Sequence, residues 1–170
     1  MSTHAPILAT HGLGLDIGGA TIVADVGLEV DDGEFLAIIG PNGAGKTSLF
    51  NLVSGLLRPT AGRVILDGRD VTREPPYRRT RLGLGRTFQL SSVFPALPAL
   101  ENVPELVDVI RTIHAEEGKT VLMVEHHMEV VTGLAQRIAV MHHGRLLAVD
   151  TPDAVMRNET VQQAYVGEPL

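Results

Sequence analysis

One glycine-rich stretch carries the clearest chemistry in this chain: Gly40-Pro41-Asn42-Gly43-Ala44-Gly45-Lys46-Thr47, followed by Ser48. It fits the phosphate-loop pattern G-x-x-x-x-G-K-[ST]. Glycines let consecutive backbone N–H groups turn toward a ligand, and a following helix adds the partial positive charge of its N-terminus. The Lys46 ammonium can reach the β- and γ-phosphates, the Thr47 hydroxyl can ligate Mg²⁺, and the Ser48 hydroxyl can hydrogen-bond a phosphate. The pattern predicts a nucleoside triphosphate site built from Gly40, Asn42, Gly43, Ala44, Gly45, Lys46, Thr47 and Ser48.

The elements on either side of the loop are those that this motif requires. A short apolar run at residues 35–39 lies between Gly33 and Gly40 and predicts a buried strand. After the loop, apolar residues recur at helical spacing and predict a helix with one buried side: Leu49, Phe50, Leu52, Val53 and Leu56. The strand, loop and helix in this order disfavour the alternative, a chance glycine-rich turn before a helix.

The rest of the chain alternates between strand and helix patterns. Strands are expected at residues 6–13, 21–30, 63–68, 84–89, 120–124, 137–141 and 145–149. Helices are expected at residues 77–82, 104–118, 128–134, 152–158 and 161–165. This order predicts the α/β fold class, with a β-rich subdomain laid over a P-loop core.

Two of these strands carry a specific burial prediction. In the strand at 21–30, one face is expected to hold Ile22, Ala24, Val26, Leu28 and Val30, and the other Asp25 and Glu29. The run at 120–124 is continuously apolar, which is typical of a strand buried on both faces.

The charge balance does not favour nucleic acid as a partner. The 170 residues have a formal net charge of −6, whereas a nucleic-acid footprint needs clustered positive charge. Arginines gather only at Arg73, Arg78, Arg79, Arg81 and Arg86. A solvated helix face explains this cluster better than a site for a polyanion.

Composition also bounds the compartment. There is no cysteine, so disulfides and thiolate chemistry are excluded. The first ten residues lack the basic and apolar regions of a signal peptide, and no apolar run approaches the ~18 residues of a membrane span. We expect a cytoplasmic chain that reaches a membrane only through partners.

Taken together, these segments resemble the ATPase of an ATP-binding cassette (ABC) transporter over nearly the whole chain. The resemblance rests on the phosphate loop, the strand ending at Gln89, Val124-Glu125-His126, and the tail at residues 144–148 with Thr151-Pro152. Residues 86–89 and 163–167 look most like the ATPase subunits of branched-chain amino acid importers. The resemblance implies an ATP- and Mg²⁺-dependent ATPase that pairs with a second such subunit. It also implies transmembrane permease partners and a place on the inner face of the cell membrane.

The family's roles carry over to two further residues. Gln89 matches the Q-loop glutamine, which contacts Mg²⁺ and the attacking water, and His126 matches the switch histidine, which contacts the γ-phosphate. A competing interpretation joins His126-His127 and His142-His143 in a zinc site. Adjacent strand residues point to opposite faces, which disfavours it.

The chain also departs from the family pattern. Ile17 stands where the family usually has an aromatic residue that stacks on adenine, and isoleucine offers no π-face. Only 37 positions separate Gln89 from His126, and that interval holds no signature motif and no apolar strand ending in Asp-Glu. The helical subdomain is missing, and the break falls near Val103/Pro104.

Loss of a central strand would leave buried N–H and C=O groups unpaired, at about 1–3 kcal/mol each. We therefore expect residues 1–170 to be one nucleotide-binding domain from which a segment is omitted. Without the carboxylates of that segment, the chain alone should be a poor or inactive ATPase. The alternatives are a truncated, non-hydrolysing ATP-binding or interaction module and, less favoured, another P-loop NTPase. A GTPase would show Asn-Lys-x-Asp, which is absent, and the acceptor site and lid of a kinase are not visible.

Overall fold

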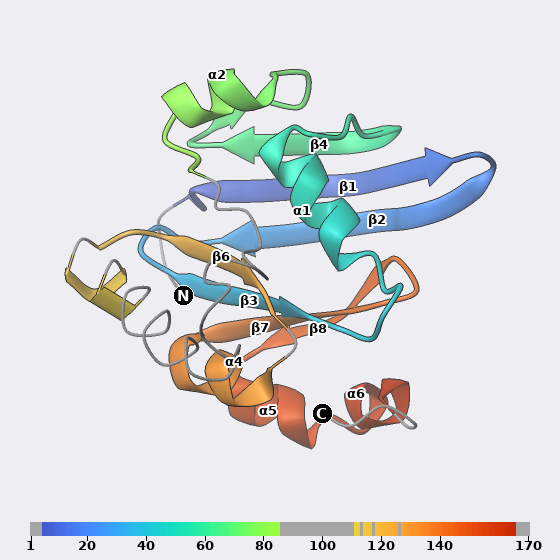
Figure 1. Ribbon diagram of the computed structural model, residues 1–170, viewed down its shortest axis with the longest axis vertical. Helices are drawn as coiled ribbons and strands as arrows, with labels where there is room; N and C mark the ends of the chain where they lie inside the picture. Colours follow the sequence, from blue (N-terminus) through green and yellow to red (C-terminus); the bar gives the residue numbers. More distant parts are fainter. Residues whose placement is uncertain (1–4, 86–110, 113, 117, 126, 166–170) are drawn as a thin grey trace, which may run out of the picture.

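Two four-stranded sheets form the body of the computed structural model, which describes residues 5–85, 111–112, 114–116, 118–125 and 127–165 (Figure 1). The strands are β1 (Leu8–Ile17), β2 (Ala20–Val30), β3 (Phe35–Ile39), β4 (Ala61–Leu66), β5 (Arg69–Asp70), β6 (Val121–Val124), β7 (Arg137–His142) and β8 (Arg145–Asp150). The first sheet is antiparallel, in the order β2-β1-β4-β5. The second has the order β6-β3-β7-β8, in which β3 runs parallel to β6 and β7 while β8 is antiparallel to β7.

Helices flank both sheets. They are α1 (Lys46–Ser54), α2 (Pro76–Arg81), α4 (Met128–Leu134), α5 (Pro152–Arg157) and α6 (Glu159–Ala164). Figure 1 shows α1 lying beside the antiparallel strands and α4, α5 and α6 gathered at the opposite end of the molecule. Residues 111–112 and 114–116 are also helical, in agreement with part of the helix expected at 104–118.

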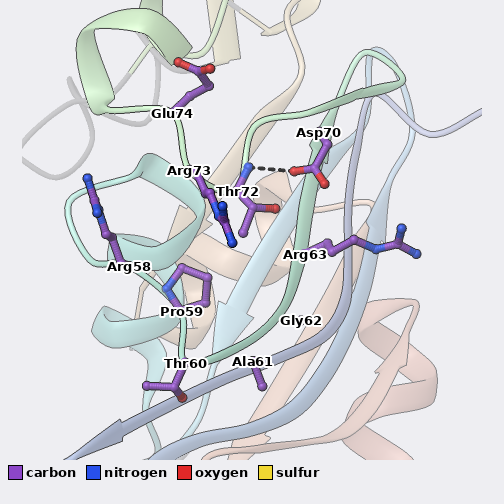
Figure 2. A pocket seen from close by; sticks show the side chains of 10 residues that line it. All are labelled: Arg58, Pro59, Thr60, Ala61, Gly62, Arg63, Asp70, Thr72, Arg73 and Glu74. Carbon is purple, nitrogen blue, oxygen red and sulfur yellow. Dashed lines mark hydrogen bonds between the residues drawn. The ribbon is translucent and has the colours of Figure 1, made fainter.

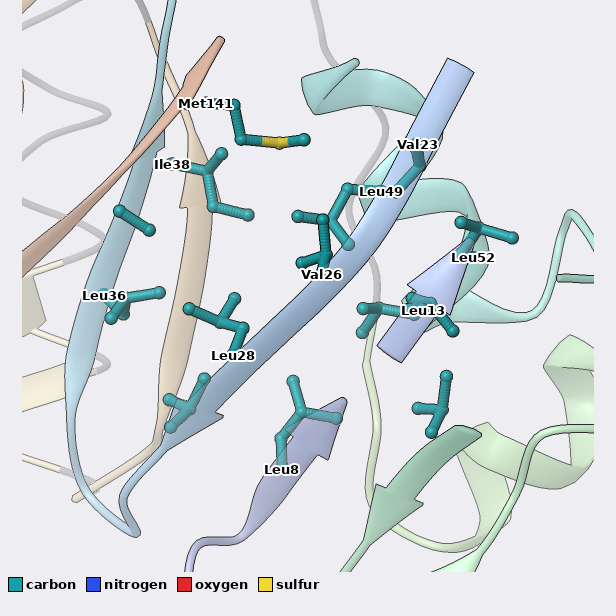
Figure 3. Close-up of a cluster of buried hydrophobic side chains, with 14 of the residues drawn as sticks. Leu8, Leu13, Val23, Val26, Leu28, Leu36, Ile38, Leu49, Leu52 and Met141 are labelled. Carbon is teal, nitrogen blue, oxygen red and sulfur yellow. The ribbon is translucent and has the colours of Figure 1, made fainter. Parts of the chain in front are cut away.

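Strand β3 explains why two cores form. Its side chains alternate between the two faces of the sheet, so Leu36 and Ile38 enter one cluster while Phe35, Ala37 and Ile39 enter the other. The first cluster fills the space between the antiparallel sheet, α1 and the second sheet (Figure 3). The second lies between the second sheet and α4, α5 and α6. All five β3 residues are buried, as the apolar run predicts.

The predicted fold class is confirmed, with a β-rich subdomain over a core of parallel strands. The burial predicted for residues 120–124 is confirmed only in part: Leu122 and Val124 pack against the first cluster, and Val121 and Met123 against the second, so both faces are covered but incompletely. Every residue of β6 is only half-buried, because within the described part of the chain β6 pairs with β3 alone and lies at the edge of its sheet.

The face predicted for β2 is correct only in its second half. Val26, Leu28 and Val30 are buried, but Val23 is also buried, while Ile22 and Ala24 are half-exposed. Asp25 has φ +54, and the pairing with β1 shifts there, from Leu13↔Val26 to Leu15↔Val23. A bulge at Asp25 therefore moves the preceding residues to the other face.

Within the described residues, no helix has both the length and the hydropathy that a membrane crossing requires.

Candidate nucleotide site

The backbone of the phosphate loop connects the end of β3 to the start of α1. Gly45 is the N-cap of α1, with φ +95, and no side chain hydrogen-bonds the first amides of the helix. No acidic residue lies in the first turn. The N-terminal N–H groups and the positive end of the helix dipole therefore have no competing carboxylate, which suits a phosphate.

All eight residues predicted for the loop fall at this junction. The Lys46 ammonium donates to the carbonyl oxygens of Gly40 and Pro41, the latter at 2.9 Å. Thr47 is exposed at the start of α1, whereas Ser48 is half-buried. The Ala44 N–H donates to the Pro41 carbonyl at 3.1 Å, which closes the loop into a compact turn.

The turn between β7 and β8 holds the loop from outside, a contact that sequence reasoning missed. His143 and Gly144 have φ +47 and +76, as a two-residue hairpin turn of type I′ requires. The Gly144 N–H donates to the Ala44 carbonyl at 3.0 Å, and the Gly144 carbonyl accepts from the Ala24 N–H of β2 at 2.8 Å. The residues His142-His143-Gly144 predicted a turn, but nothing in the sequence indicated that this turn contacts the phosphate loop.

The far end of α1 is held by Arg79, which corrects the expectation for the arginine cluster. Arg73, Arg78 and Arg81 are exposed and Arg86 lies outside the described residues, but Arg79 is only 1% exposed. Its guanidinium donates to four backbone carbonyls, those of Leu52, Val53, Thr72 and Glu74, at 2.6–3.1 Å.

Two of these carbonyls belong to the last turn of α1, where a cation complements the negative end of the helix dipole. Burial lowers the pKa of the Arg79 guanidinium from its ordinary value, and the charges of Glu74 and Asp70 act in the opposite direction. The Arg79 side chain is thus structural, not solvated.

The carboxyl end of β6 lies beside the strand that leads to the loop, because Val124 pairs with Ile38. The next residue, Glu125, accepts from the His127 N–H at 3.1 Å, and His127 Nδ1 lies 2.8 Å from the same oxygen. The predicted residues Gln89 and His126, like the expected break at Val103/Pro104, lie outside the described residues.

The zinc interpretation gains no support from the part of the chain that is described. The rings of His142 and His143 lie 4.0 Å apart, centroid to centroid. No group of three or more histidine, cysteine, aspartate or glutamate side chains in the described ranges could hold a metal ion. Ile17, at the end of β1, is 54% exposed.

A cavity of about 620 Å³ lies away from the loop, between the end of α1 and β5 (Figure 2). Its lining carries both signs of charge, from Arg58, Arg63 and Arg73 and from Asp70 and Glu74. The Asp70 carboxylate accepts from the Thr72 N–H at 2.9 Å. Hydrogen bonds from Thr72 are the main reason that the pKa of Asp70 lies below its ordinary value, with smaller contributions from Arg63 and Arg73.

The parallel strand, the glycine loop and the uncapped helix define a P-loop nucleotide-binding domain. Residues 23–160 match the family described as ABC transporter. The chain therefore belongs to the ABC transporter family, in which it is the ATP-binding ATPase domain.

Known relatives agree with this assignment. The "Probable ABC transporter ATP-binding protein" of Azorhizobium caulinodans is 28% identical over 233 positions, which cover 95% of this chain and 83% of that protein. The high-affinity branched-chain amino acid transport ATP-binding protein LivG of Salmonella typhimurium is 25% identical over 251 positions, covering 96% and 98%. A crystal structure of a nucleotide-free ATP-binding cassette from an ABC transporter superposes with a TM-score of 0.82 at 20% identity, covering 95% of this chain and 99% of that one. This last match supports the fold alone.

Proposed function

We propose that this protein binds Mg²⁺–ATP at the phosphate loop and couples ATP binding and hydrolysis to solute uptake, as the ATP-binding subunit of an importer. The observation that carries the proposal is the bare N-terminus of α1, which has neither a side-chain cap nor an acidic residue in its first turn. A helix end of this kind directs backbone N–H donors and the positive end of the helix dipole toward phosphate oxygens.

The loop residues have separate roles in this site. Lys46 exchanges its carbonyl acceptors, Gly40 and Pro41, for phosphate oxygens, and Ser48 adds a hydroxyl donor. The exposed Thr47 hydroxyl fits Mg²⁺, which commonly takes one or two protein ligands and completes its shell with phosphate oxygens and water. Bound Mg²⁺ neutralises charge on the phosphates. By resemblance, Gln89 and His126 would complete the site at the metal and the γ-phosphate.

The solute and the partners are inferred from sequence likeness. The LivG relative bears the name of a branched-chain amino acid transport protein, and residues 86–89 and 163–167 resemble the same group. We infer uptake of branched-chain amino acids or a related small solute. The subunit would pair with a second nucleotide-binding subunit and with transmembrane permeases, on the cytoplasmic face of the membrane.

The natural protein, we infer, contains a segment that is absent near Val103/Pro104. The alignment with the Azorhizobium protein spans 233 positions, although 95% of this chain is only about 162 residues, so about 71 positions have no counterpart here. By the same comparison, about 88 positions of LivG have none. A segment of that size can hold the helical subdomain, the signature motif and the strand with the catalytic carboxylates.

A non-hydrolysing ATP-binding module is the second candidate. It is the direct interpretation of the sequence as it stands, in which no apolar strand ends in Asp-Glu. Such a chain would bind nucleotide and its membrane partner without turnover.

Replacement of the loop lysine tests nucleotide binding. Lys46→Ala should weaken ATP binding by roughly 10- to 100-fold, because a charge-assisted hydrogen bond is worth about 1.5–3 kcal/mol. Calorimetric titration of ATP with Mg²⁺ into the purified chain gives the affinity. The matched control is Lys119→Ala, since Lys119 is exposed and is the other lysine of the chain. Equal affinities in the two variants would refute the site.

The intact mass of the protein purified from its native cell separates the two candidates. A mass about 8 kDa above the calculated 18.2 kDa would support the omitted segment and the importer ATPase. A mass of 18.2 kDa would support the truncated module. Leucine uptake by cells that carry Lys46→Ala then tests the solute, because uptake should fall while that of an unrelated sugar stays unchanged.

A further inference from the structure

We propose that Gly144 is a positioning residue for nucleotide binding, because its N–H aims one amide of the phosphate loop at the ligand. The inference rests on the nucleotide site described above, but it concerns a residue in a different hairpin. Gly144 is 100 positions from the loop residue Ala44 in sequence, and the two are joined by a hydrogen bond of 3.0 Å.

The contact sets the direction of a peptide plane. The Ala44 carbonyl and the Gly45 N–H belong to the same planar trans peptide, so they point in opposite directions. Gly144 holds the Ala44 oxygen on the outer side of the loop. The Gly45 N–H is thereby turned to the other side, where it adds to the donors at the start of α1.

The Gly144 residue is itself anchored on its other side. Its carbonyl accepts from the Ala24 N–H at 2.8 Å, which ties the turn to β2 in the antiparallel sheet. One residue therefore connects the loop to a strand of the other sheet. A turn without this bond could move together with the loop. Because the turn is bound to β2, it holds the phosphate loop in a fixed position relative to the antiparallel sheet.

The junction has no space for a side chain. A Cβ on Gly144 would lie 2.6 Å from the Ile22 carbonyl oxygen, and one on Gly45 would lie 2.8 Å from the same oxygen. Because the obstacle is backbone, a substitution at Gly144 must move either β2 or the turn. Either displacement lengthens the bond to Ala44 and releases the peptide plane.

The test compares Gly144→Ala with a matched variant, Gly68→Ala, in the full chain. Gly68 has φ +70 and follows Asp67 with φ +48, so its turn nearly repeats His143 and Gly144, yet a Cβ there would meet nothing within 4 Å. Both variants carry the same backbone strain, and both should melt at lower temperature. Only Gly144→Ala should weaken ADP binding, by about tenfold, as expected for one misaligned hydrogen bond to phosphate. Equal ADP affinities for the two variants would overturn the proposal.

Parallel ADP titrations of the wild-type protein and of Lys46→Ala distinguish a failure of this inference from a failure of the nucleotide site. Failure of the wild type to bind, or binding that Lys46→Ala leaves unchanged, would refute the nucleotide site. Normal binding by the wild type and by folded Gly144→Ala, with loss in Lys46→Ala, would refute only the role of Gly144.

Amide hydrogen exchange of the wild type, with and without ADP, keeps the proposal testable if Gly144→Ala does not fold. Bound ADP should slow exchange of the Gly144 amide, which donates to the loop, several-fold. The Val71 amide, which donates to Val64 beside the other turn, is the internal control and should not change. Equal changes in the exchange rates of the two amides on ADP binding would overturn the proposal.

Discussion

The β4–β5 and β7–β8 hairpins have nearly the same turn but different surroundings. Asp67 and Gly68 have φ +48 and +70, and His143 and Gly144 have φ +47 and +76. A side chain at Gly68 would face open space, whereas one at Gly144 would meet the Ile22 carbonyl. Local backbone preference therefore explains the glycine in both turns, but only the second glycine is also required by a neighbour.

The two ends of α1 are also held by different means, one by the β7–β8 turn and the other by Arg79 of α2. The β7–β8 turn contacts the loop before α1 through its backbone. Near β4–β5, the end of α1 is instead held by the side chain of Arg79, which also binds the carbonyls of Thr72 and Glu74 after β5. A backbone contact is sensitive to added bulk, whereas a side-chain contact is sensitive to truncation.

Truncation of Arg79 should give the largest loss of stability. Arg79→Ala leaves four backbone carbonyls without their donor, two of them in the last turn of α1. We expect unfolding free energy to fall by about 3 kcal/mol, after partial compensation by water. Urea denaturation followed by circular dichroism measures the change.

The neighbouring Arg78 supplies the control for that measurement. Arg78 is exposed, and its ion pair with Glu74, at 3.1 Å, lies at the surface. Arg78→Ala should leave the free energy of unfolding nearly unchanged, because an exposed ion pair contributes little. Similar losses in the two variants would mean that Arg79 is not the link between α1 and the β4–β5 side.

A smaller difference should separate the two turn glycines in stability. Gly68→Ala should cost about 1 kcal/mol, the strain of an L-residue in the left-handed region. Gly144→Ala carries the same strain together with the contact at Ile22, so its cost should exceed that of Gly68→Ala by roughly 1 kcal/mol, and it should stay below that of Arg79→Ala. Thermal unfolding at a fixed heating rate compares them, and equal costs would show that the junction relaxes freely.

The sequence predicted the elements better than their contacts. The apolar run at 35–39, the glycine loop and the helix after it follow from local pattern, and all three are present. The hydrogen bond from Gly144 to Ala44 and the burial of Arg79 join residues far apart in sequence, so no local pattern contains them. The extent of burial of β6 was overestimated because a strand's apolar content does not reveal how many neighbours it has.

The residue before each turn glycine offers a more modest test. His143 and Asp67 both have positive φ, a conformation that asparagine tolerates better than most residues. His143→Asn should raise stability by about 0.5 kcal/mol and leave ADP affinity unchanged, because the bond to Ala44 comes from Gly144. A loss of ADP affinity in His143→Asn would mean that the His143 imidazole also helps to position the phosphate loop.

The smallest effect should come from Asp70, which ends β5 and accepts hydrogen bonds from Thr72. The pKa of Asp70 in the folded protein lies below its ordinary value of 3.8, so the ionised carboxylate stabilises the fold. That contribution is complete above about pH 4 and is lost as the pH falls through the lowered pKa. The stability advantage of the parent over Asp70→Asn should therefore be constant between about pH 5 and 7 and shrink at about pH 3.

Salt identifies the cause of that pH dependence. Hydrogen bonds from Thr72 contribute more to the lowered pKa of Asp70 than do the charges of Arg63 and Arg73. Salt screens interactions between exposed charges but leaves a short hydrogen bond largely intact. The difference in stability between the parent protein and Asp70→Asn should thus persist in 1 M salt, where the screening length is about 3 Å. Its disappearance would mean that the arginines around the cavity, and not the turn after β5, hold the carboxylate in its ionised form.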